Sequence, residues 1–142
     1  MTGKPVTVTV ARRFDAPPER LFDAWLDPEG IGGWLFATPG GTMEKVEVDA
    51  RVGGRFAVAE RRGRERAEHF GQYVELHRPR RIVFDFWTSF AAERTRITVD
   101  IVPDGSGARL TLTHEGVWPD YEARTREGWT MILDGLAASL AR

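Results

Sequence analysis

Apolar and polar residues alternate along most of this chain with the two-residue period of a half-buried β-strand. The first such segment places valines at positions 6, 8 and 10 between threonines. The same alternation predicts further strands over residues 43–49, 55–60 and 68–76, and around residues 82–86, 97–101 and 110–114. Short turns rich in glycine and proline separate these segments. The pattern therefore predicts seven strands in an antiparallel meander.

Helical signals flank this block of strands. An aspartate followed by two prolines (residues 15–18) predicts a short helix that begins near Pro18, and Asp27-Pro28 predicts a second one towards Trp34. After Pro119 the apolar spacing changes to three and four residues, which indicates a helix of about 30 Å with one apolar face. The residues of that face are Trp129, Ile132, Leu133, Leu136, Ala137 and Leu140.

The C-terminal helix is the element long enough to cover the predicted sheet. A sheet that curves around one helix is hard to fill with side chains, so we expect an α+β fold with a cavity between helix and sheet. Gly128 and Gly135 lie seven residues apart on one side of that helix. Each costs about 1 kcal/mol relative to alanine in a helix interior. Two explanations stay open, close packing against another backbone or space left for a ligand.

Composition narrows the class of protein. The chain has 142 residues and a formal net charge of -1, and we expect a single domain over residues 1–142. The charge gives no field that favours nucleic acid or an anionic membrane, and no apolar run reaches the ~18 residues of a membrane helix. Cysteine is absent and residues 1–5 lack a signal-peptide pattern, which predicts a cytoplasmic protein. We interpret the arginine-rich segments 61–66 and 78–81 as solvated hairpin ends.

His114 is the most informative polar residue, because it continues the stripe of Leu110 and Leu112. If that stripe faces inward, an imidazole lies at the mouth of the cavity. There it could exchange a proton with a carbonyl or hydroxyl group of a bound molecule. It could equally be a structural histidine whose ring is hydrogen-bonded to the backbone or to a helix terminus.

The strand that contains Gln72 allows two orientations. With Phe70 inward, Gln72 is a second polar group in the cavity. In the opposite phase Gln72 faces solvent, and the inward residues are His69, Gly71 and Tyr73. The sequence leaves both open, because a bulge would shift the alternation.

Inward-facing apolar residues, many of them aromatic, would suit a flat apolar ligand. With Gln72 inward, the residues predicted to contact such a ligand are Phe56, Phe70, Gln72, Phe84, Phe86, Leu110, Leu112, His114, Trp129, Ile132 and Leu133. Trp87 is out of phase with Phe84 and Phe86. It either lies on the outer surface, where it would suit a homodimer contact, or follows a bulge.

Motifs for catalysis or cofactor binding are not recognisable in the sequence. The three serines have no nucleophile-elbow context, and the three histidines lack metal-ligand spacing. The glycine pairs lack the strand-to-helix setting of a phosphate-binding loop. We therefore expect no metal and no cofactor.

Five segments between Val6 and Leu140 carry a resemblance to a known family. They are residues 14–25 (FDAPPERLFDAW), 52–56 (VGGRF), 79–84 (PRRIVF), 110–116 (LTLTHEG) and the pair Gly128-Trp129. In this order they resemble the START/Bet v-type helix-grip superfamily, also called SRPBCC. More narrowly, they resemble its branch named for activators of the ATPase of the 90-kDa heat-shock protein. The resemblance implies a helix-grip fold, a curved seven-stranded antiparallel sheet around a long C-terminal helix, with two short helices between strands one and two.

Members of this superfamily bind lipids, sterols, polyketides or other apolar molecules, and some are cyclases, dehydratases or hydrolases. Three hypotheses of function follow. The first is a binding protein for a small hydrophobic or amphipathic ligand, lipid-like or polyketide-like. The second is a cyclase-like or hydratase-like enzyme with His114 as the acid-base residue. The third is an interaction protein, a homodimer or a partner of the chaperone, that uses Trp87 or the outer sheet.

Overall fold

Seven antiparallel strands form one sheet in the order β1-β7-β6-β5-β4-β3-β2 within residues 3–141, the part of the chain that the computed structural model describes. The strands are β1 (Val6–Phe14), β2 (Thr42–Val48), β3 (Arg55–Arg62), β4 (Glu65–His77), β5 (Arg81–Thr88), β6 (Ala91–Asp104) and β7 (Gly107–Val117). Strands β2 to β7 pair with their neighbours in the chain, and β1 closes the other edge against β7. This confirms the predicted meander. Met1, Thr2 and Arg142, which the expected domain range includes, lie outside the described residues.

Two short helical segments lie between β1 and β2, as predicted. The first is α1 (Pro18–Ala24), which begins at the expected proline. The second, η1 (Ile31–Gly33), is a single 3-10 turn. Its glycines make a longer helix unfavourable. At the other end of the chain, the turn η2 (Pro119–Tyr121) leads into the 19-residue helix α2 (Glu122–Leu140).

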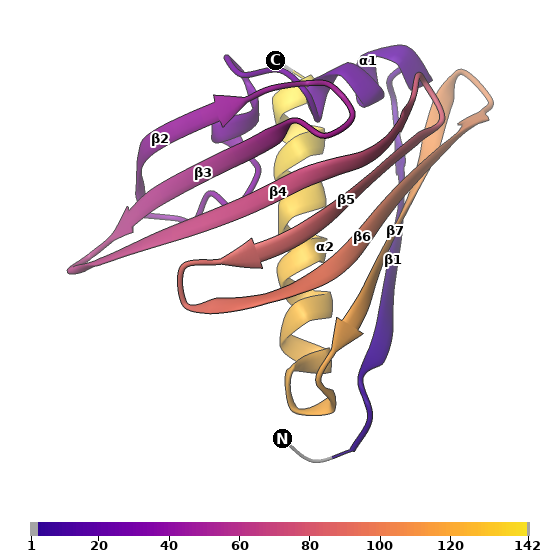
Figure 1. Ribbon diagram of the computed structural model, residues 1–142. Coiled ribbons are helices and arrows are strands. Elements are labelled where there is room, and N and C mark those ends of the chain that lie inside the picture. The colour runs from indigo at the N-terminus through magenta and orange to yellow at the C-terminus, as the bar shows by residue number, and fades with distance from the viewer. Residues whose placement is uncertain (1–2, 142) are drawn as a thin grey trace.

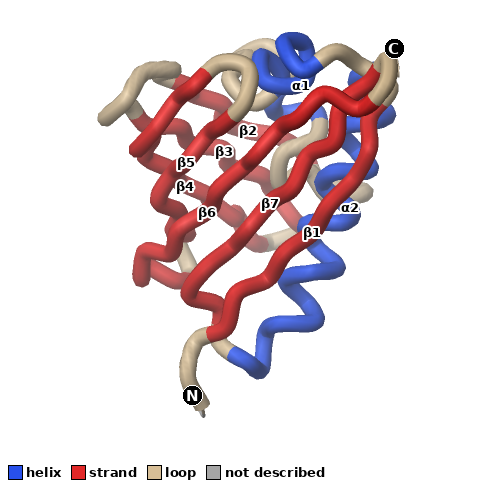
Figure 2. Tube along the Cα trace, turned by 90° about the vertical axis from the view of Figure 1, so that its right-hand side faces the viewer, coloured by secondary structure: helices blue, strands red, loops and turns tan. Residues whose placement is uncertain are grey.

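The sheet curves around α2, which runs along its concave side (Figure 1). Figure 2 shows the strands from the outer side, with α2 behind them and α1 at the end of the sheet near the C-terminus. The predicted apolar face of α2 meets the core, because Trp129, Leu133 and Leu136 are buried and Ile132 packs beside them. This α+β architecture of a curved sheet closed by one long helix is the helix-grip fold.

Irregular pairing helps the sheet to bend. The register shifts between Tyr73 and Glu75 in the β4–β5 pair and between Phe86 and Thr88 in the β5–β6 pair. An extra residue on one strand bends that strand and increases its twist. Similar shifts occur in the β1–β7 and β2–β3 pairs, so irregular pairing is found at the edges of the sheet as well as at its centre.

Of the two orientations that the sequence left open for β4, the one with Phe70 and Gln72 inward is wrong and the other is confirmed. In β4 the buried positions are Ala67, His69, Gly71 and Tyr73. Gln72 lies on the outer face, where its Oε1 accepts a hydrogen bond from Arg94 Nη1 at 3.0 Å. Long-range packing selects this phase, because the Phe56 ring occupies the space where a Cβ on Gly71 would lie. Local alternation could not reveal that contact.

Trp87 lies on the same outer face, and it also lies at the register shift between Phe86 and Thr88, so both alternatives that the sequence offered apply. Its ring stacks on Phe70 with centroids 5.8 Å apart, and the Arg94 guanidinium lies 4.1 Å from the ring centroid on Trp87. Phe70 therefore packs against Trp87 outside the sheet and does not line the concave side.

We predict that Gly71→Ala lowers the free energy of unfolding by about 1–3 kcal/mol, because the added methyl would overlap the Phe56 ring and force it to move. Urea unfolding followed by tryptophan fluorescence measures the change. Gly33→Ala is the matched control, since its Cβ would meet no atom within 4 Å. Equal effects of the two substitutions would contradict the packing of Phe56 on Gly71.

Candidate functional site

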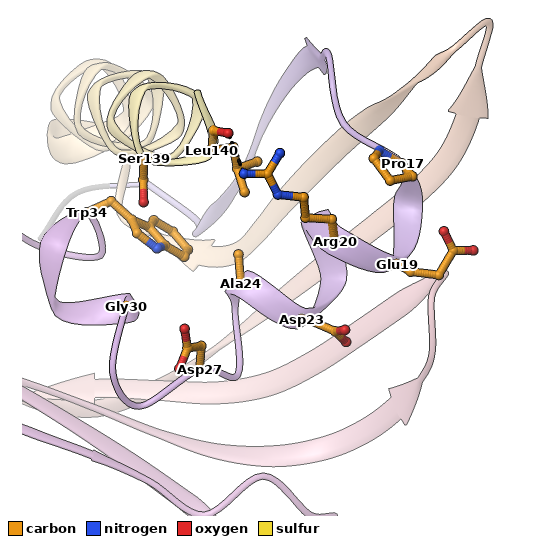
Figure 3. A pocket seen from close by; sticks show the side chains of 10 residues that line it. All are labelled: Pro17, Glu19, Arg20, Asp23, Ala24, Asp27, Gly30, Trp34, Ser139 and Leu140. Carbon is orange, nitrogen blue, oxygen red and sulfur yellow. Dashed lines mark hydrogen bonds between the residues drawn. The ribbon is translucent and has the colours of Figure 1, made fainter. Parts of the chain in front are cut away.

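A groove of about 530 Å³ lies between α1 and the C-terminal end of α2 (Figure 3). Arg20 donates a hydrogen bond to the Leu140 carbonyl across this groove, and Asp23, which also lines it, accepts one from Arg78 Nε at 2.8 Å. Its four charged side chains are exposed, and three of them, Arg20, Asp23 and Asp27, have hydrogen-bond partners. The groove is therefore a solvent-exposed surface feature that offers few unpaired polar groups to a ligand.

A second concavity, of about 370 Å³, lies between the N-terminal half of α2 and the concave side of the sheet. We call it the helix–sheet pocket. The residues that line it are Phe36, Ala37, Thr38, Arg62, His69, Phe86, Thr88, Phe90, His114, Arg124, Thr125, Gly128, Trp129, Met131 and Ile132. They come from β3, β4, β5, β7, α2 and two loops, so the pocket exists only once the whole sheet has closed on the helix.

Aromatic rings form much of the wall of the helix–sheet pocket. The His69 imidazole stacks on Phe36 with centroids 4.1 Å apart and planes 7° from parallel, and Phe36 stacks in turn on Phe86 at 5.3 Å. Phe90 meets His69 edge-on at 5.9 Å, and Trp129 meets Phe36 at 5.6 Å. Rings in these offset and edge-on arrangements present flat apolar faces to a ligand.

His114 is fixed on both sides of its ring. Trp129 Nε1 donates a hydrogen bond to Nδ1 at 3.1 Å, so the neutral imidazole carries its own proton on Nε2. Nε2 then donates to Thr95 Oγ1 at 2.8 Å, and this hydroxyl donates to the Phe86 carbonyl at 3.4 Å. Burial lowers the pKa of His114 to about 4, so the ring is neutral at pH 7. This arrangement matches a structural histidine with side-chain partners, whereas the sequence had suggested backbone or a helix terminus.

His69 is the second buried histidine of the pocket, with only 6% of its surface exposed. Burial, assisted by the positive charge of Arg62, lowers the pKa of this imidazole to about 4. Its Nδ1 atom has no hydrogen-bond partner among residues 3–141. The aromatic stack on Phe36 therefore helps to hold a ring whose Nδ1 atom makes no hydrogen bond within that range.

A buried carboxylate holds the loop that carries Phe36. Glu60 is 2% exposed and accepts hydrogen bonds from Thr38 N at 2.9 Å, Thr38 Oγ1 at 2.6 Å and Arg62 Nε at 2.7 Å. Burial alone would raise the pKa of Glu60, but these donors outweigh it and the pKa is lowered. Arg62 Nη2 also donates to the Phe36 carbonyl at 3.0 Å. Phe36 has a φ of 58°, a left-handed conformation that phenylalanine rarely adopts, and this network holds it there.

Gly128 lies at the centre of the helix face that lines the pocket. The residues three and four positions before it and after it, Thr125, Arg124, Met131 and Ile132, all line the pocket. A Cβ on Gly128 would meet no atom within 4 Å. The glycine therefore leaves open space in the pocket, which is the second of the two explanations that the sequence offered.

Gly135 is different, because its Cβ would lie 3.6 Å from Trp34 Cβ. This is an ordinary van der Waals distance, so an alanine would fit and close packing does not require the glycine. The two glycines therefore differ in their surroundings, since Gly128 faces open space and Gly135 faces Trp34.

Four of the eleven predicted contact residues line the helix–sheet pocket. They are Phe86, His114, Trp129 and Ile132. The five others that face inward belong to the filled core and do not line the pocket: Phe56, Phe84, Leu110, Leu112 and Leu133. The remaining two, Phe70 and Gln72, are on the outer face as described above.

Sequence reasoning missed three features of the site. Phe36 lies in a loop after η1, and Phe90 lies at the tip between β5 and β6, where alternation gives no signal. Arg62 was assigned to a solvated hairpin end, yet its side chain lines the pocket and pairs with Glu60. The spacing offered a clue, because Phe56, Val58, Glu60 and Arg62 share one face of β3.

Among residues 3–141, no group of three histidine, cysteine, aspartate or glutamate side chains could hold a metal ion. In the same range, no helix is long and apolar enough to cross a membrane.

A curved sheet that grips one long helix, with a pocket between the two, places this chain in the helix-grip class. A family model described as Activator of Hsp90 ATPase homolog 1-like protein matches residues 15–141, and the chain belongs to that family. The match confirms the branch that the sequence motifs indicated. A comparison with curated proteins finds no match.

Solved structures with the same fold come from several bacteria. Protein CV1439 from Chromobacterium violaceum is 32% identical, with a TM-score of 0.84 over 94% of this chain and 96% of that one. A protein from Rhizobium leguminosarum is 22% identical, with a TM-score of 0.85 over 98% and 96% of the two chains. A protein of unknown function from Staphylococcus aureus is 14% identical, with a TM-score of 0.87 over 97% and 94%. The last two show the fold alone.

The two buried histidines predict a pH-dependent stability. The pKa of each is about 4 in the folded protein and 6.5 for an unperturbed imidazole, the value expected in the unfolded chain. The unfolded state therefore binds more protons between these two values. The free energy of unfolding should be highest above pH 6.5, and it should fall by about 2 kcal/mol per histidine at pH 5.

Urea unfolding at pH 7 and pH 5 tests this, and most carboxylates stay ionised throughout this window. His69→Phe keeps an aromatic ring in the stack and removes one titrating group, so it should lose about half of the pH dependence. A variant that loses as much stability as the unmodified protein would show that His69 is not one of the two groups.

Proposed function

We propose that this protein binds a small, flat hydrophobic or amphipathic molecule, lipid-like or polyketide-like, in the helix–sheet pocket. The observation that carries the proposal is an aromatic-walled pocket that opens onto a helical glycine with no packing partner. Its volume of about 370 Å³ falls within the usual range for small-molecule sites of roughly 300–1,000 Å³.

The lining has the composition expected of a binding site. Large apolar side chains provide contact area, and a few polar groups at fixed positions could orient a ligand. The Phe36–His69–Phe86 stack supplies one wall, and Trp129 and Ile132 supply the helix side. Flat ring systems bury most of their surface between such walls, which favours them over branched or bulky ligands.

The surroundings of Gly128 favour ligand binding over close packing as the reason for a glycine at this position. A glycine in the middle of a 19-residue helix costs about 1 kcal/mol relative to alanine, and here no neighbouring atom requires its small size. An alanine would stabilise the helix without a clash. Open space at this position is more useful for a ligand than for the stability of the free protein.

The alternative of an enzyme that uses His114 has less support. Both ring nitrogens of His114 are engaged by Trp129 and Thr95, and burial lowers its pKa well below 7. An acid-base residue needs a nitrogen within reach of the substrate and a pKa near the working pH. The hypothesis of a chaperone partner rests on the family alone.

The binding proposal is tested with N-phenyl-1-naphthylamine, a neutral, flat probe whose fluorescence rises in apolar surroundings. We expect saturable binding to the unmodified protein. Gly128→Leu should weaken it by about ten-fold or more, because the new side chain fills the pocket. Gly128→Ala should raise the free energy of unfolding by up to about 1 kcal/mol while weakening binding less.

Ala138→Leu is the control, since it places the same side chain at an exposed position of α2 outside the pocket. It should leave the affinity for the probe unchanged. Absence of saturable binding, or an equal loss of affinity in both leucine variants, would overturn the proposal.

A further inference from the structure

The charged groups of the helix–sheet pocket are all positive. Arg62 and Arg124 line it, and the two lining histidines are neutral at pH 7 because burial lowers their pKa values. Among the described residues that line the pocket there is no aspartate or glutamate. A cation would therefore meet repulsion in this pocket, whereas an anion would meet attraction.

Arg124 supplies an uncompensated charge. It lies in the first turn of α2, and its guanidinium lies 5.8 Å from the ring centroid of Tyr121. Within residues 3–141 its side chain forms no ion pair and no hydrogen bond to a carboxylate. The amide dipoles of α2 add a partial positive charge at the same end of the helix.

Arg62 supplies a directed donor. Its Nε is held by Glu60 and its Nη2 by the Phe36 carbonyl, which leaves Nη1 without a partner among the described residues. The carboxylate of Glu60 is buried and accepts three hydrogen bonds, so it balances part of the charge of Arg62 without facing the pocket. The guanidinium is thereby oriented before any ligand arrives.

We propose that the ligand of this pocket is an amphipathic carboxylate. Its flat apolar body packs against the Phe36–His69–Phe86 stack and Trp129, and its carboxylate pairs with Arg124 and accepts from Arg62. This inference rests on the proposed function, and it adds the chemical class of the ligand. A guanidinium suits it, because two N–H groups can donate to the two oxygens of one carboxylate.

The test compares two compounds of nearly equal shape, 2-naphthoate and 2-naphthamide, as competitors of N-phenyl-1-naphthylamine at pH 7.5. We expect 2-naphthoate to displace the probe at a concentration at least ten-fold lower than 2-naphthamide. Arg124→Ala should remove most of that preference, because it weakens the binding of 2-naphthoate at least ten-fold more than that of 2-naphthamide. Arg124→Lys should keep part of it, since the charge remains but the paired donors do not.

Arg109→Ala is the control for net charge, because Arg109 is exposed and alternates with the inward Leu110. It should leave the preference intact. If 2-naphthoate displaces the probe no better than 2-naphthamide does, or if the preference survives Arg124→Ala, the carboxylate proposal is overturned while the binding proposal stands. Failure of the neutral probe to bind would instead overturn the binding proposal.

Discussion

The hydrogen bond from Trp129 to His114 joins the long helix to the sheet at the boundary between filled and open interior. Towards the C-terminus of α2, Leu133 and Leu136 are fully buried in the core. Towards its N-terminus, Gly128 and Arg124 face the helix–sheet pocket. Since the bond is buried, loss of either partner would leave the other polar group unsatisfied, at a cost of about 1–3 kcal/mol. It therefore fixes both the seating of the helix and the orientation of the ring that forms one pocket wall.

Hydrogen bonds of this kind fix the positions of side chains beside an open pocket, which apolar packing alone could not do. A fully apolar wall next to a pocket would relax into the empty space, because dispersion forces have little directional preference. The pocket instead has the chain from Trp129 through His114 to Thr95 on one side and the Glu60 network on the other. Each network sets the position of an aromatic ring, His114 in the first case and Phe36 in the second.

Most of the fold could be predicted from local pattern, because strand alternation and helical spacing are properties of neighbouring residues. The same pattern identified His114, Trp129, Ile132 and Phe86 as inward-facing. It could not separate pocket from core, since Leu112 and His114 share one stripe and differ only in how near the helix packs. Local pattern also could not predict which residues of β4 face inward, because this depends on the contact of Phe56 on β3 with Gly71 on β4. Arg62 was missed because an arginine near a turn usually points to solvent.

Unfavourable features gather around the helix–sheet pocket. Gly128 weakens its helix, Phe36 has a left-handed φ, and the Nδ1 atom of His69 is buried without a partner among the described residues. Each lowers stability by about 1–3 kcal/mol, and nearby packing shows no need for them. Buried polar atoms without a partner within residues 3–141 also occur away from the pocket, at Trp25 Nε1 and at the Tyr73 hydroxyl, so the features particular to the pocket are the open space beside Gly128 and the left-handed φ of Phe36. Open space beside a helical glycine agrees with the proposed binding function, because a ligand would supply the missing contacts only when it is bound.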